Sequence, residues 1–203
     1  MSNRQFPTFV DLPKVTIIED RENNFRYKIS IPFQFAVPRK SKKALVIMKN
    51  PSKARIDHIM KIYHSDTTAD RVLNYLYRKS FTEVIIVNLF ATYETYAENL
   101  NKLVNEPNKL IGIQNDTIIQ DCIKELEEND IILVAWGGYP KDSSKEMKII
   151  YHERINKVES LINKKNVKYV DRLVKNKKFP LHGLQWAYDQ ELYDYLIQKN
   201  SIK

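Results

Sequence analysis

Apolar and polar positions alternate in blocks along the chain, and the blocks have two different periods. Three short and almost continuous apolar runs, 44–48, 83–87 and 130–135, are bounded by polar or turn-forming residues. Such runs are typical of strands buried on both faces of a parallel sheet. Between them, apolar residues recur at helical spacing over 69–76, 118–126 and 147–162. Strands that alternate with helices predict βαβ units, so we expect an α/β fold.

Weaker patterns extend this prediction toward both ends of the chain. Two β-rich runs, 14–19 and 24–31, surround a polar segment and predict an N-terminal hairpin. Residues 168–174 predict a fourth core strand and 189–198 a last helix, while Asn115 or Asp116 is placed to cap the helix that follows it. We therefore expect a three-layer αβα sandwich with a central, mostly parallel four-stranded sheet, preceded by the hairpin.

The same patterns indicate a single domain over residues 1–203. The chain has no internal repeat, low-complexity segment or linker that would divide it, and its 43% hydrophobic content suffices for one buried core. We expect a flexible lead-in over 1–13, the hairpin and a loop over 14–43, and the α/β core over 44–203. A charged content of 29% with 11% aromatic residues excludes global disorder.

Charge adds a candidate partner. The chain has 33 Lys and Arg residues against 25 Asp and Glu, a formal net charge of +8, and a pI near 9.3. This excess favours a polyanion, because Lys and Arg that meet phosphates release condensed counterions, although it also serves solubility. Basic residues gather over 39–43 and 164–178. We expect contacts with the backbone of single- or double-stranded DNA from Lys42, Lys43, Lys175, Lys177 and Lys178, the alternative being a solvated surface.

Few residues suit metal, redox or cofactor chemistry. The single cysteine, Cys122, lies among apolar residues at helical spacing, which indicates a core residue in a reducing compartment. The sequence contains no Gly-x-Gly-x-x-Gly, no Walker phosphate loop, no Gly-x-Ser-x-Gly elbow and no zinc-type Cys/His set. His58 and His64 do not share a helical face, so we expect no metal and no cofactor. No signal-type leader and no apolar run of about 20 residues is present, which predicts a cytoplasmic monomer without a membrane partner.

Polar or small residues follow each predicted core strand. Ligands of open α/β sheets bind at the carboxyl ends of the strands. Each of these residues also has an ordinary interpretation, as a turn, a cap, a flexible glycine or a structural histidine. Their combination predicts one common cleft, large enough for a nucleobase, lined by Asn50, Ser52, Asn88, Gly137, Gly138 and His182.

The order of these motifs resembles a bacterial and phage family known as domain of unknown function 1643. The resemblance covers roughly residues 25–190, and the motifs are specific together rather than singly. They are Asn50-Pro51-Ser52, Asp66-Thr67-Thr68 with Arg71, Asn88-Leu89-Phe90-Ala91, Asn115-Asp116, Ala135-Trp136-Gly137 and Pro180-Leu181-His182.

A more distant resemblance connects the chain with the uracil-DNA-glycosylase superfamily. It implies that Asn50 positions the attacking water, that Asn88 reads the edge of a flipped base, and that His182 stabilises charge on the departing base. Asp66 would supply the acidic group that the first motif lacks. The candidates for stacking on the base are Tyr63, Phe90 and Tyr93.

The chain also departs from that superfamily. His182 is followed by Gly183-Leu184 rather than Pro-Ser, which implies an altered DNA-entering loop and a modified or bulkier base than uracil. The resemblance thus predicts a DNA glycosylase-like hydrolase that acts on a flipped base, in DNA repair or in defence against phage. The alternatives are a non-catalytic nucleic-acid-binding module and an enzyme that acts on free nucleosides or nucleotides.

Overall fold

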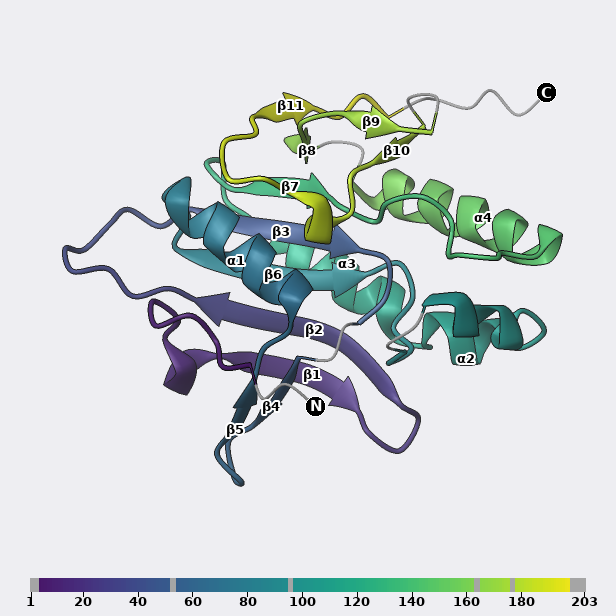
Figure 1. The fold of residues 1–203 in the computed structure, drawn as a ribbon, viewed down its shortest axis with the longest axis horizontal. Coiled ribbons are helices and arrows are strands. Elements are labelled where there is room, and N and C mark those ends of the chain that lie inside the picture. Colours follow the sequence, from purple (N-terminus) through teal and green to yellow (C-terminus); the bar gives the residue numbers. More distant parts are fainter. Residues whose placement is uncertain (1–3, 52–53, 95–96, 163–164, 176–177, 198–203) are drawn as a thin grey trace.

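The computed structural model describes residues 4–51, 54–94, 97–162, 165–175 and 178–197, which form a mixed α/β fold (Figure 1). The strands are β1 (Thr16–Asp20), β2 (Phe25–Pro32), β3 (Lys43–Met48), β4 (Arg55–Asp57), β5 (Ile62–His64), β6 (Glu83–Asn88), β7 (Ile131–Val134), β8 (Val167–Val170), β9 (Leu173–Val174), β10 (Phe179–Pro180) and β11 (Leu192–Asp194). The helices are α1 (Thr67–Arg78), α2 (Pro107–Ile111), α3 (Asn115–Lys124) and α4 (Lys145–Ile162), with 3-10 turns η1 (Leu12–Lys14), η2 (Ala97–Leu103) and η3 (Gly183–Gln185).

The central sheet is mixed and has seven strands in the order β1-β2-β6-β3-β7-β8-β11. Its four middle strands, β6, β3, β7 and β8, are parallel, as expected of the core. The expected sheet of four strands is therefore too small. The N-terminal hairpin joins the same sheet because β2 pairs antiparallel with β6, and β11 extends the other edge by pairing antiparallel with β8.

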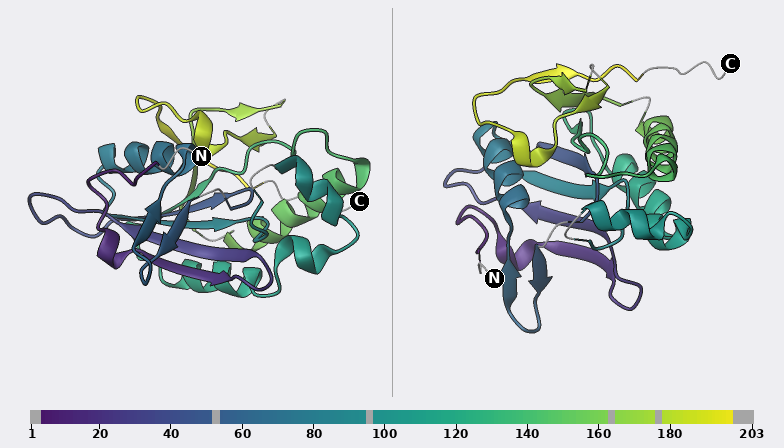
Figure 2. Two further views of the ribbon diagram at one scale, coloured as in Figure 1. Left: turned by 60° about the horizontal axis from the view of Figure 1, so that its bottom comes forward. Right: turned by 45° about the vertical axis from the view of Figure 1, so that its right-hand side comes forward.

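Helices cover both faces of this sheet, so the α/β prediction is confirmed at that level (Figure 2). Alternate side chains of β3 point to opposite faces. Val46 and Met48 pack in the layer that contains α1, whereas Leu45 and Ile47 pack in the layer that contains α3 and α4. The predicted helical stripes are the buried faces of α1, α3 and α4.

The predicted helix over 189–198 is wrong. The chain there forms the edge strand β11, which pairs with β8 through Tyr193 and Tyr169. The Tyr195 hydroxyl donates a hydrogen bond of 2.6 Å to Glu159 on α4, which fixes the end of this segment. Aromatic residues favour strands on a half-buried surface, and pairing with a distant strand outweighs the local helical spacing.

The segment expected to be a flexible lead-in packs against the rest of the chain over residues 4–13. Phe6 and Val10 are buried in the same core layer as α1. Val10 also forms a bridge to Phe33, and Gln5 to His64. Among the described residues, no helix has the length and apolar character needed to cross a membrane.

Candidate functional site

The carboxyl end of β3 is a topological switch point. From β3 the chain continues to α1 on one face of the sheet, whereas β6 and β7 continue to α3 and α4 on the other face. Connections that diverge between neighbouring parallel strands leave a crevice at their carboxyl ends. The strand-end residues of β3, β6 and β7 therefore border the place where this fold binds ligands.

Backbone hydrogen bonds hold these strand ends in register beyond the strands themselves. The Leu89 amide donates to the Met48 carbonyl at 2.8 Å, and the Phe90 amide to the Lys49 carbonyl at 2.9 Å. On the other side, the Ala135 amide donates to the Ile47 carbonyl at 2.8 Å. The residues that follow β3, β6 and β7 are thus placed side by side.

The loop that carries His182 joins the same edge through close contacts at two glycines. Gly137 has a φ of +68°, and a Cβ at this position would lie 3.0 Å from the His182 Cβ. A Cβ on Gly183 would lie 2.7 Å from Val72 on α1 and 3.5 Å from the Met48 sulfur. Side chains at these two positions would push the loop away from β7 and α1, so glycine permits the close approach.

His182 is held in its neutral form. Its Nδ1 accepts a hydrogen bond from the Leu184 amide at 3.3 Å, which places the ring proton on Nε2. Although part of the residue reaches the surface, desolvation lowers the pKa of the imidazole to about 4, and the positive charge of Lys49 lowers it further against the opposing effect of Asp66. At neutral pH His182 therefore offers an uncharged N–H donor.

Lys49 is a functional candidate that the sequence prediction missed. It directly follows β3 and continues the face of Leu45 and Ile47, so that only 9% of it is exposed. Its ammonium lies 5.8 Å from the ring centroid of Tyr151 on α4. Burial lowers its pKa to about 8, and the charge of Lys175 acts in the same direction. The sequence feature that could have indicated it is a lysine directly after the buried apolar run 44–48.

Asn88 occupies the end of β6 as predicted and is almost fully buried, with 1% exposed. Among the described residues its side-chain oxygen Oδ1 has no hydrogen-bond partner. Its own carbonyl accepts a hydrogen bond of 3.1 Å from the side chain of Asn115. A buried carboxamide with an unpaired oxygen is costly unless a ligand supplies the missing donor.

Asn115 and Asp116 position the loop after β6 instead of capping α3. The N-cap of α3 is Gln114, and the side chain of Asn115 donates to the carbonyls of Asn88 and Leu89 at 3.1 Å. Arg154 on α4 donates to the Leu89 carbonyl at 2.6 Å and forms an ion pair with Asp116 at 2.5 Å. These contacts hold the strand end from the side of α4.

The other two predicted catalytic residues bind backbone. The Asn50 Nδ2 donates to the carbonyls of Pro51 and Glu94, which ties the ends of β3 and β6 together. Asp66 caps α1 by accepting from the amides of Thr68 and Ala69, and its second oxygen accepts from the Ala54 amide at 2.8 Å. Asp66 therefore has a structural role, and its predicted role toward water stays a prediction. Ser52 lies outside the described residues.

The aromatic candidates are placed differently from one another. Phe90 is fully buried against Tyr151, with ring centroids 6.0 Å apart. Tyr93 is half-buried, and its hydroxyl donates to the Ala54 carbonyl at 2.8 Å. Tyr63 lies in the β4–β5 hairpin, which projects beyond β1 in Figure 1. Tyr139, which the sequence did not single out, packs on Tyr151 and Phe179 close to Gly138.

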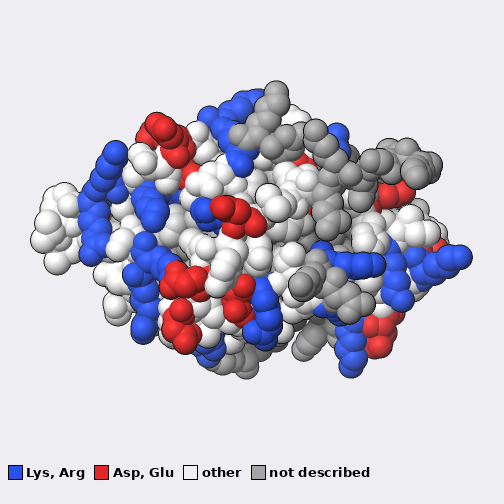
Figure 3. Space-filling view, turned by 90° about the horizontal axis from the view of Figure 1, so that it is seen from above, with Lys and Arg blue, Asp and Glu red and all other residues white. Residues whose placement is uncertain are grey.

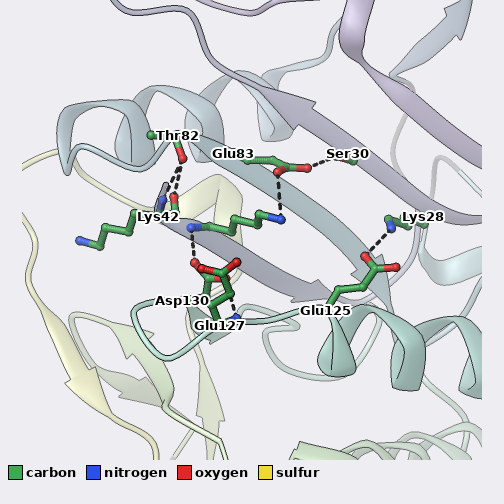
Figure 4. A network of polar contacts seen from close by, with 9 residues as sticks. Lys28, Ser30, Lys42, Thr82, Glu83, Glu125, Glu127 and Asp130 are labelled. Carbon is green, nitrogen blue, oxygen red and sulfur yellow. Dashed lines mark hydrogen bonds and ion pairs between the residues drawn. The ribbon is translucent and has the colours of Figure 1, made fainter. Parts of the chain in front are cut away.

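Lys42 and Lys43 lie at the opposite end of β3 from Asn50, and the six residues of β3 span roughly 17 Å at about 3.3 Å per residue. In Figure 4 they belong to a network at the amino ends of the strands, where the Lys43 ammonium pairs with Glu83 at 3.7 Å and its amide donates to Asp130. Phosphates bound at this end would not adjoin the strand-end site.

The second basic stretch is only partly available for phosphates. Lys168 pairs with Asp194 and Arg172 with Asp171, and acidic groups are interspersed among the basic ones on the face seen in Figure 3. Lys175 and Lys178 are exposed, and Lys177 lies outside the described residues. Of the lysines predicted to contact the DNA backbone, Lys175 is the one whose side chain reaches the strand-end site, beside Gly138.

A separate groove of about 540 Å³ lies between the α2–α3 segment and α4. Its charged lining includes Asp116 and Arg154, which already pair with each other. Across the described ranges, no group of three or more His, Cys, Asp or Glu side chains could hold a metal ion. The strand-end site therefore remains the stronger candidate.

The fold and this edge define an α/β protein whose polar and basic residues Lys49, Asn88 and His182 gather at the carboxyl ends of its parallel strands. A family model matches residues 34–184, and the chain belongs to the family described as Protein of unknown function (DUF1643). The matched range contains every strand-end residue from Lys49 to His182. No curated protein and no solved structure matches the chain.

Proposed function

We propose that this protein hydrolyses the N-glycosidic bond of a DNA base that is flipped into the strand-end site. The observation that supports this most directly is that a neutral His182, packed against the Gly137 turn after β7, and the buried carboxamide of Asn88, at the end of β6, lie at the same edge of the sheet. One group is an uncharged N–H donor, and the other can both donate to and accept from the edge of a base. Together they suit a substrate that is read as a neutral base and leaves as an anion.

In the proposed reaction, water adds to C1′ of the sugar while the bond between C1′ and the base nitrogen breaks. The electron pair of that bond leaves with the base, which then takes up a proton, so the products are a free base and an abasic sugar. The Nε2–H of His182 would donate to the base as its negative charge develops. A fixed donor of this kind contributes about 3–4 kcal/mol to lowering a reaction barrier.

Asn50 and Asn88 would divide the remaining tasks. The Asn50 Nδ2 is held by two carbonyls, so its Oδ1 is directed by the backbone and can orient the attacking water. The unpaired Oδ1 of Asn88 would accept a hydrogen bond from a ring or exocyclic N–H of the base. Gly137 and its neighbour Gly138 allow His182 and Lys175 to pack closely against the turn after β7.

The test is incubation of the protein with duplex and single-stranded DNAs that carry varied modified bases. Mass spectrometry then measures released base and abasic sites. We expect release from at least one DNA, reduced about 100- to 1000-fold in His182→Ala and in Asn88→Ala. The matched control is His64→Ala on β5, which should keep full activity. Full base release by folded His182→Ala would refute the proposed role of that residue.

A second candidate is an enzyme that acts on free nucleosides or nucleotides. The observation that favours it is the ion pairing of Lys168 and Arg172, which leaves less unpaired basic surface for a DNA duplex. The same assay separates the candidates when free deoxynucleosides and deoxynucleotides are added as substrates. Salt-sensitive DNA binding without any base release would instead indicate a binding module.

A further inference from the structure

We propose that Lys49 and Lys175 form a subsite for a phosphate group at the carboxyl end of β3. The subsite lies next to the place where Asn88 and His182 would meet a base. This inference deepens the proposed function and rests on it for the identity of the substrate, because it names the phosphate-bearing part that the site would take. It does not depend on the chemistry at the glycosidic bond.

The first observation is the isolation of Lys49. Only 9% of the residue is exposed, and no ion pair or hydrogen bond joins its ammonium to any described residue, while the ammonium nitrogen is not among the fully enclosed atoms and so stays open to a ligand. Lysines are almost never buried without an anionic partner, because desolvating an unpaired charge is costly. An anion from outside the protein would supply that partner.

The second observation is that a second cation reaches the same place from a different part of the chain. Lys175 follows β9 and has a left-handed backbone, with a φ of +50°. Its Cε and Nζ lie 2.9 and 3.0 Å from the position that a Cβ on Gly138 would take. The ammonium of Lys175 is thus drawn across the Gly137-Gly138 turn, where any larger side chain than glycine would obstruct it.

The two ammonium groups sit on neighbouring aromatic rings. Lys49 Nζ lies 5.8 Å from the Tyr151 centroid and Lys175 Nζ lies 5.5 Å from the Tyr139 centroid. The two rings are 5.7 Å apart. After burial, the charge of Lys175 also lowers the pKa of Lys49. Like charges held together without a carboxylate destabilise one another until an anion binds to both.

A phosphate suits this arrangement better than a carboxylate. A phosphate monoester has close to two negative charges near neutral pH and a phosphodiester has one, and both present several acceptor oxygens for two ammonium groups with three donors each. The third basic residue, His182, is neutral and would serve the base instead of the phosphate. The phosphate could belong to a free nucleotide or to the backbone of DNA, and the chemistry of recognition is the same for both.

The experiment measures binding by isothermal titration and by thermal denaturation, at constant ionic strength set with chloride. The probes are inorganic phosphate, pyrophosphate, deoxynucleoside 5′-monophosphates, the matching nucleosides and short oligonucleotides. We expect at least one phosphate-bearing probe to bind and to raise Tm. Lys49→Met and Lys175→Met should each weaken that binding at least tenfold. Lys124→Met, at the end of α3 where its ammonium pairs with Asp121 at 2.8 Å, is the control and should bind normally.

The probes also separate the two sources of phosphate. Tight binding of a monophosphate relative to its nucleoside supports a free nucleotide, and binding of oligonucleotides alone supports the DNA backbone. Either result supports the subsite. Equal affinity in Lys49→Met and the unaltered protein overturns it, and so does the failure of every probe to bind. Base release that is unchanged in both lysine variants would leave the proposed function intact without the subsite. Phosphate binding without base release would leave the subsite intact without that function.

Discussion

Replacing Lys49 with Met should stabilise the protein when no ligand is bound. Lowering the pKa of a lysine from its usual 10.5 to about 8 corresponds to about 3 kcal/mol of unfavourable free energy for the charged folded state, at about 1.4 kcal/mol per pKa unit. Methionine has a similar length and removes the charge without leaving a large cavity. It also removes the attraction between the ammonium and Tyr151, worth about 0.5–2 kcal/mol. The net expectation is a stabilisation of about 1–3 kcal/mol at pH 7.

The difference between the two proteins should depend on pH with a definite sign. Because the pKa of Lys49 is lower in the folded state, the unfolded chain binds more protons between about pH 8 and pH 10.5. The unaltered protein therefore gains stability relative to Lys49→Met as pH rises through this window. Burial raises the pKa of Tyr151 and lowers that of His182, so neither changes charge between pH 7 and about 9.5. The advantage of the variant should fall by about 2 kcal/mol over that range.

Urea denaturation followed by tryptophan fluorescence measures this difference, because Trp136 and Trp186 are both buried in the folded state. Lys28→Met is the matched control. Its ammonium pairs with Glu125 at 3.4 Å, so its removal should change stability by less than about 1 kcal/mol and in the destabilising direction. A loss of more than about 1 kcal/mol in Lys49→Met at pH 7 would show that the ammonium has a favourable partner and would refute the reasoning.

Three further predictions concern the surroundings of the site. Asp66→Ala should cost about 1–2 kcal/mol in urea denaturation, because it removes the cap of α1 and leaves the Ala54 amide without its acceptor. Gly137→Ala should cost about 1–3 kcal/mol in the same assay, from its φ of +68° and the 3.0 Å approach to His182, and unchanged stability would contradict this geometry. Base release, if His182 acts as a neutral donor, should not decline between pH 8 and pH 5, and a loss near pH 6.5 would indicate that the imidazole titrates normally.

The elements buried on all sides could be predicted because their signal is local. The runs at 44–48 and 83–87 became β3 and β6, since a strand covered on both faces must be apolar along its whole length. The stripe over 147–162 became the buried face of α4 for the same reason. Asn88 and His182 could be proposed for one edge of the sheet because parallel strands end at a common edge, and their sharing of one cleft stays a prediction.

What depended on distant pairing could not be predicted from local patterns. Residues 192–194 have a spacing that also suits a helix, and only the unpaired edge of β8 makes them a strand. The hairpin became part of the central sheet because β2 pairs with β6, for example Ile29 with Ile86, and this pairing joins segments that are distant in the sequence. The basic groups at Lys42 and Lys175 look alike in sequence, yet they lie at opposite ends of the sheet.

The sequence by itself determined the layer architecture and the edge at which polar residues gather, because burial and strand direction are written in the period and order of apolar residues. Only the tertiary structure decided which charged residue at that edge is buried without a hydrogen-bond or ion-pair partner among the described residues. Lys49 is a strand-end lysine in the sequence, and it becomes a buried cation only in the folded chain, where its ammonium lies 5.8 Å from the Tyr151 ring centroid. Desolvation is a property of the assembled surroundings, so no local pattern reports it.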